Sequence, residues 1–177
     1  MTEVRGINPV EGYEYLVTAR EKLFEWVRPL TLDQYTREFP FGIKSVRNSL
    51  VEIAGGEWTY TRRLRGEQML PEADRPFPPF QKTEFAPLER AWQEQVEVTR
   101  RTLSEITDWS KRVEYIAVFP NRPKLRITTT TGGIAMQLLF HEIHHRAQAM
   151  AMLRHLGVPA QNLDYSILKF ERTEVPA

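Results

Sequence analysis

The feature that most restricts the fold is a long helical pattern at residues 131–156, which carries three histidines within positions 141–145. On a helix of about 100° per residue, His141 and His145 lie one turn apart on one face, so both imidazoles can reach one ion. One stripe holds the pair together with apolar residues: Ile134, Leu138, His141, His145, Met152 and Leu156. Imidazoles in such a core-facing row are costly to bury unless they are hydrogen-bonded or metal-bound. The pattern therefore favours a metal site on this helix.

Three earlier segments also have helical periodicity: residues 9–27, 45–65 and 87–109. Two β-prone runs, 112–119 and 124–131, follow the third of them and are separated by "PNRP", which predicts a hairpin. Gly157, with Pro159 behind it, ends the last helix. The order predicts an all-α four-helix bundle, with a small β-hairpin inserted between helices three and four, as a single domain over residues 1–177.

The connecting segments have less regular patterns. Residues 30–44 read as a polar connector with aromatic anchors, and the proline-rich stretch 69–85 as a loop. The sequence of the tail, residues 164–170, predicts a short helix or a packed extended segment. Inside the second helix, Gly55 and Gly56 cost about 1 kcal/mol each relative to alanine, so close packing or a cavity wall is expected there.

Composition limits the function. The chain of 177 residues has 24 basic and 23 acidic residues. It therefore lacks the excess of positive charge that is typical of proteins that bind nucleic acid or an anionic membrane. It has no cysteine, so a metal must be held by His, Asp or Glu. The longest apolar run, 132–140, is half a membrane span, and residues 1–15 lack the apolar region of a secretion signal. A cytoplasmic protein without a nucleic-acid or membrane partner is expected.

The stretch from His141 to His145 also satisfies the H-E-x-x-H pattern of zincin peptidases. The extended zincin pattern fails, because Gln148 stands where glycine is required and Ala151 where histidine is required. Glu171 and Glu174 lie in the tail, with no clear helix to present either as a third ligand. A peptidase is therefore the least favoured alternative, and Glu142 is predicted not to act as a general base.

The segment "LLFHEIHHRAQAMAMLRHLGVPAQNLDY" (138–165) resembles the last-helix motif of the DinB-like (YfiT-like) superfamily, H-x-x-x-H-R-G-Q followed by L-R-x-L-G. Residues 44–64 look like its second-helix motif. The resemblance implies a divalent metal inside the bundle, held by one histidine of the second helix and two of the last. His141 and His145 match the last-helix pair, and the second-helix position falls on Glu52. Glu57, which shares the apolar stripe of its helix, is the competing carboxylate.

Characterised relatives include low-molecular-weight thiol S-transferases and a mycothiol-dependent isomerase. The resemblance implies an open metal position that binds a small-molecule substrate, such as a low-molecular-weight thiol; activated water would instead give a hydrolase. Zinc or nickel is expected, and the carboxylate of Glu52 makes manganese or iron acceptable. The alternative is a non-catalytic bundle, metal-binding or metal-free, that serves assembly or a stress response. A second apolar row, formed by Leu139, Ile143 and Met150, must also be covered, by a neighbouring helix, by the hairpin or by a second subunit, and a homodimer is therefore one expectation.

Overall fold

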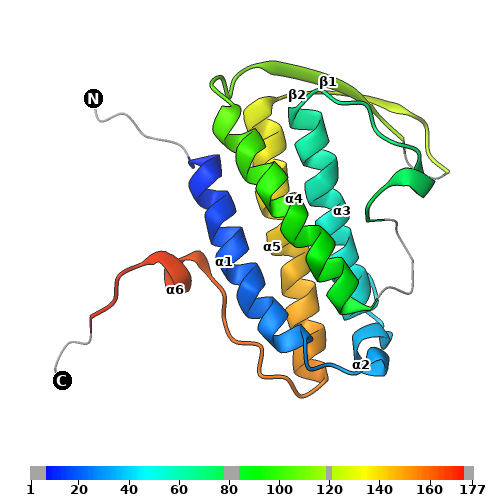
Figure 1. Cartoon of the computed structure of the whole chain (residues 1–177), viewed down its shortest axis with the longest axis vertical. Helices are drawn as coiled ribbons and strands as arrows, with labels where there is room; N and C mark the ends of the chain where they lie inside the picture. Colours follow the sequence, from blue (N-terminus) through cyan, green and yellow to red (C-terminus); the bar gives the residue numbers. More distant parts are fainter. Residues whose placement is uncertain (1–6, 78–83, 119–120, 174–177) are drawn as a thin grey trace.

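The computed structural model describes residues 7–77, 84–118 and 121–173. Four long helices form an upright bundle (Figure 1): α1 Pro9–Val27, α3 Val46–Leu64, α4 Phe85–Glu105 and α5 Thr131–His155. A β-hairpin joins α4 to α5, which confirms the predicted all-α bundle with an inserted hairpin. The part of the proline-rich loop at residues 78–83 lies outside the described residues.

Capping side chains set the helix starts that the sequence indicates. Asn8 accepts a hydrogen bond from the Val10 amide beside Pro9, and Ser45 accepts one from the Asn48 amide. At the far end of α5, Gly157 takes a positive φ of 83°, where a glycine avoids the steric cost of a side chain.

The third long helix, α4, ends earlier than the sequence predicts. Its periodicity predicts a helix that continues to Trp109, but α4 stops at Glu105, and Ile106 is already extended. Asp108 accepts hydrogen bonds from the backbone and hydroxyl of Ser110, which stabilise a turn instead of a further helical turn. The Trp109 carbonyl accepts from the Gly132 amide at 2.8 Å. This turn directs the chain into the hairpin beside the start of α5.

Short helices occupy parts of the connectors. The expectation of an irregular connector at residues 30–44 is wrong at α2, Leu32–Thr36, because Thr31 and Gln34 form a capping box that starts a helix. A 3-10 turn, η1 Glu72–Asp74, lies in the proline-rich loop. The tail forms α6, Tyr165–Lys169, one of the two forms that its sequence predicts.

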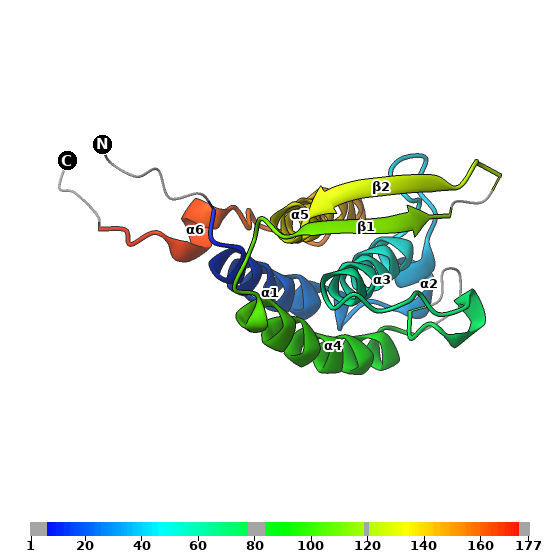
Figure 2. The ribbon, with the colours of Figure 1, turned by 90° about the horizontal axis from the view of Figure 1, so that it is seen from above.

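The hairpin consists of β1 Arg112–Ala117 and β2 Leu125–Thr130, paired antiparallel from Arg112 opposite Thr130 to Ala117 opposite Leu125. Seen from above, it covers the side of the bundle formed by α3 and α5, and α4 lies on the opposite side (Figure 2). The hairpin therefore forms one wall over the two helices that carry the candidate ligands.

The apolar row of α5 opposite His141 is divided between core and surface. Leu139 and Met150 are buried, and α1 approaches so closely that a Cβ on Gly12 would lie 2.7 Å from Leu139 Cδ1. Ile143 keeps 40% of its surface exposed, and neighbouring Phe140 keeps 55%. The homodimer that this row suggested stays a prediction. Within the described ranges, no helix combines the length and the apolar character needed to cross a bilayer.

Candidate metal centre

Two helices bring the sequence-predicted ligands together. Glu52 lies on α3 and the histidine pair on α5, and these two helices pack along their length. Among the described residues, Glu52, His141 and His145 form a group whose donor atoms all lie within 4.8 Å of one another. The Glu52 carboxylate is 3.5 Å from His141 Nε2, and the two imidazole centroids are 4.6 Å apart.

This arrangement fits a divalent ion. In a tetrahedral site with bonds of about 2.1 Å, ligand atoms lie about 3.4 Å apart, close to the separation between Glu52 and His141. The wider separations within the group require a small contraction. Two neutral imidazoles and one carboxylate make a three-ligand set that leaves a position open for a substrate. The donors and their spacing therefore fit a divalent metal ion.

Gly56 provides the space for His141. A Cβ at residue 56 would lie only 2.7 Å from His141 Nδ1, so a side chain there would displace the imidazole. Tyr60, one turn further along α3, packs edge-on against the same ring with centroids 5.5 Å apart. The glycine pair therefore borders both a close contact and a cavity, as its sequence suggested.

Gln148 orients the second histidine, a role that was not foreseen from the sequence. Its side-chain oxygen lies 3.1 Å from His145 Nδ1, and its amide nitrogen donates to His144 Nε2 at 2.9 Å. In the tautomer where His145 Nδ1–H donates to this oxygen, the Nε2 lone pair is free for an ion. The spacing of three residues from His145 on one helix is the signal that could have identified Gln148.

The surroundings of Glu52 and His145 favour the protonation state in which each side chain can bind a metal ion. The hydrogen bond with His141 is the main cause that lowers the pKa of the Glu52 carboxyl. Burial is the main cause that lowers the pKa of His145, which favours its neutral imidazole. The side chain of His141 is 13% exposed, whereas that of Glu52 is 51% exposed. The group thus lies at the boundary between the bundle interior and solvent.

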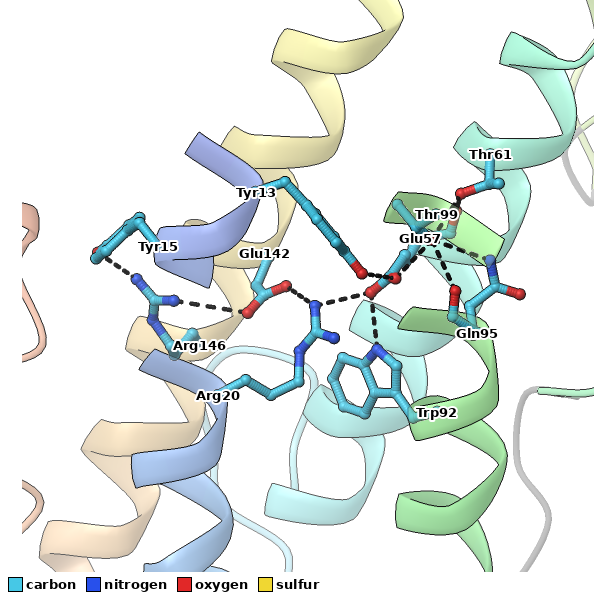
Figure 3. A network of polar contacts seen from close by, with 10 residues as sticks. All are labelled: Tyr13, Tyr15, Arg20, Glu57, Thr61, Trp92, Gln95, Thr99, Glu142 and Arg146. Carbon is cyan, nitrogen blue, oxygen red and sulfur yellow. Dashed lines mark hydrogen bonds and ion pairs between the residues drawn. The ribbon is translucent and has the colours of Figure 1, made fainter. Parts of the chain in front are cut away.

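Glu57, the competing carboxylate, belongs to a different cluster in the bundle interior. It accepts hydrogen bonds from Tyr13 at 2.5 Å, Arg20 at 2.7 Å and Trp92 at 2.8 Å (Figure 3). Thr99 donates to it at 2.7 Å. These four donors occupy its oxygens, so the structure brings Glu52 rather than Glu57 to the histidine pair.

Glu142 points away from the histidine pair. Its carboxylate accepts from Arg20 at 2.5 Å and lies 3.5 Å from Arg146, and the three side chains are almost fully buried (Figure 3). Arg146 also donates to the Tyr15 hydroxyl at 2.5 Å. Burial lowers the pKa of Arg20, but Glu142 and Glu57 outweigh it and raise this pKa above its ordinary value. A carboxylate held in this way joins helices and does not face a substrate.

A cavity of about 550 Å³ borders the candidate centre. Glu52 and His141 lie in its wall together with Gly56 and Thr59, so the small-residue face of α3 lines a cavity as the sequence allowed. The hairpin contributes Tyr115, Ala117, Ile127 and Thr129. The volume lies in the range of small-molecule sites.

The fold and the site define a class of protein: a four-helix bundle with an inserted hairpin, in which two histidines of the last helix meet a carboxylate of the second long helix beside a cavity. The model of the DinB family matches residues 2–174. The chain therefore belongs to the DinB family, which confirms the resemblance. A search of curated proteins finds no match.

Proposed function

We propose that this protein is a metal-dependent enzyme that binds one divalent ion through Glu52, His141 and His145 and acts on a small-molecule thiol. The observation that carries the proposal is the placement of three metal-type donors within 4.8 Å of one another, two of which, Glu52 and His141, lie in the wall of a cavity. Zinc or nickel suits the two imidazoles, and the carboxylate also accepts manganese or iron.

The chemistry follows from what an ion supplies at this position. A coordinated thiol loses its proton near neutral pH, which gives a reactive thiolate. The chain has no cysteine, so the thiol is a small cosubstrate. Gln148 lies within hydrogen-bond distance of His145 Nδ1, and Gly56 leaves room for His141. The hairpin forms one wall of the cavity that would receive the thiol.

A non-catalytic bundle is the second candidate, and the exposure of Glu52 favours it. A side chain that is 51% exposed loses conformational freedom when it coordinates an ion, which weakens binding. A closed sphere of four protein ligands would favour this structural role further. Within the described residues the group has three members and opens on a cavity, and this supports the enzyme.

Cobalt(II) substitution tests the proposal, because a thiolate bound to cobalt gives a charge-transfer absorption band. Cobalt-loaded protein is expected to develop this band on titration with cysteine or glutathione. His145→Ala should bind less cobalt and give a weaker band. His155→Ala, at the far end of the same helix, is the control and should behave like the parent. A parent that holds cobalt but gives no thiolate band would favour the non-catalytic bundle.

A further inference from the structure

The cavity extends well beyond the candidate ligands. Glu52 and Arg63 both line it, and they are eleven positions apart on α3. Eleven residues correspond to about 16 Å of rise and a rotation of about 20°, so both side chains share one face of the helix. A ligand in this cavity can therefore meet the candidate centre at one end and a guanidinium at the other.

Arg63 lies between aromatic side chains and forms no ion pair with any described residue. Its guanidinium carbon is 4.0 Å from the centroid of the Tyr115 ring and 5.6 Å from that of Tyr60. Its Nε is buried with no hydrogen-bond partner in the part of the chain that the structure describes, and Nη1 reaches the Tyr115 hydroxyl at 3.4 Å. Among the described residues, no carboxylate lies within 4.0 Å of this guanidinium, whereas Arg62 and Arg65 both pair with Glu67.

The charges of the cavity favour an anion. A divalent ion contributes two positive charges and Arg63 one, and the carboxylate of Glu52 contributes one negative charge. Arg75 also lines the cavity. A partly buried guanidinium with an unsatisfied donor gains stability when an acceptor with negative charge approaches it.

We infer that the cavity binds an anionic small molecule whose carboxylate or phosphate pairs with Arg63 while its other end reaches Glu52, His141 and His145. Carboxylates and phosphates both suit the planar fork of an arginine. The contact with the candidate centre formed by Glu52, His141 and His145 rests on the proposed function. The contact with Arg63 does not depend on it. The stacked tyrosines hold the guanidinium in place, so little conformational freedom is lost on binding.

Matched thiols that differ only in their far end test this inference. The probes are 6-mercaptohexanoate, 6-mercaptohexyl phosphate and the neutral 6-mercaptohexanol, and calorimetric titrations use both cobalt-loaded and metal-free protein. At least one anionic probe is expected to bind about tenfold more tightly than the alcohol, the gain of one charge-assisted hydrogen bond. The comparison of carboxylate with phosphate identifies the preferred anion.

Two variants assign the preference to Arg63. Arg63→Gln should reduce the preference for the anions to below about twofold with unchanged cobalt content, and Arg63→Lys should keep part of it. Arg65→Gln, the control at the same helix end, should retain the parental preference. Equal binding of acid and alcohol by the parent, or a preference that survives in Arg63→Gln, would overturn the inference. A parent that binds no cobalt refutes the proposed function, and the metal-free titrations still decide the role of Arg63.

Discussion

At the scale of single residues, Gly56 of α3 lies directly against the imidazole of His141 on α5. Gly56→Ala places a methyl group 2.7 Å from His141 Nδ1 and should move the imidazole, so metal affinity is expected to fall at least about tenfold. Gly55→Ala is the matched control, because its Cβ meets the Phe77 carbonyl at an ordinary 3.5 Å. Isothermal titration with zinc measures both affinities. Equal losses in the two variants would show that helix packing rather than the position of His141 controls affinity.

Glu52 is the residue at which this chain departs from the three-histidine pattern that its resemblance implies. Glu52→His should retain a metal and shift the preference towards zinc or nickel, because a neutral imidazole replaces an anionic oxygen. Glu52→Ala should lower the affinity by about tenfold or more, since two ligands remain. Competition titrations with zinc and manganese measure the preference. If both variants bind the same ion as tightly as the parent, Glu52 is not a ligand.

A substitution at Glu142 distinguishes a structural role of this carboxylate from a role in a peptidase mechanism. Glu142→Gln removes one of the two carboxylates that neutralise Arg20, so the free energy of unfolding is expected to fall by about 3 kcal/mol. Its zinc content should match that of the parent. Urea denaturation and elemental analysis provide the two measurements. Parental stability combined with the loss of a peptidase activity would instead restore the zincin interpretation.

At the scale of helices, Glu14 of α1 and Arg100 of α4 form an ion pair with two N–O contacts of 2.8 and 2.9 Å. The hydrogen bond from Arg100 is the main cause that lowers the pKa of Glu14. A lowered folded-state pKa means that the pair stabilises the fold above about pH 4.3, the unfolded value, and that this contribution is lost as pH falls through the folded value.

Glu14→Gln should therefore reduce the free energy of unfolding at pH 7 by at most about 1 kcal/mol, because both partners are well exposed. The difference from the parent should shrink as pH falls from 5 towards 3. Glu25→Gln, on the same helix, is a control whose pair with Lys22 lies within one helix. A deficit that stays constant with pH would assign the effect to packing instead of charge.

The helices were predictable from the sequence to different degrees. Caps and periodicity mark the bounds of α1, α3 and α5 because Asn8, Ser45 and Gly157 act locally. The early end of α4 was missed although the turn between Asp108 and Ser110 is a local signal, whereas the hydrogen bond between Trp109 and the distant Gly132 could not be predicted. Helix α2 was missed although its capping box is a local signal.

The residues of the candidate site were also predictable only where local sequence signals or the family resemblance determine them. Helical spacing places His141 beside His145, and the family resemblance adds Glu52. The environment of Glu57 could not be predicted, because four donors from α1 and α4 converge on it (Figure 3). The cavity and Arg63 also depend on the hairpin, whose position over α3 is a property of the tertiary fold. Sequence periodicity cannot specify such contacts between distant segments.

At the scale of the whole molecule, an ion held by Glu52 and the histidine pair would join α3 to α5. A ligand that binds only the folded state stabilises it by about 2.7 kcal/mol at a concentration 100 times its Kd. The bundle should therefore unfold at a higher temperature with the metal than after chelation. The removal of both imidazoles should abolish this difference.

The most direct test is the metal content of protein purified without added metal or chelator, measured by elemental analysis together with the unfolding temperature. We expect close to one divalent ion per chain, a fall in the unfolding temperature on chelation, and recovery on addition of the ion. The double variant His141→Ala/His145→Ala should hold little metal and show no response to chelation. A parent without metal, whose unfolding temperature is the same with and without zinc or nickel, would contradict the proposed metal centre.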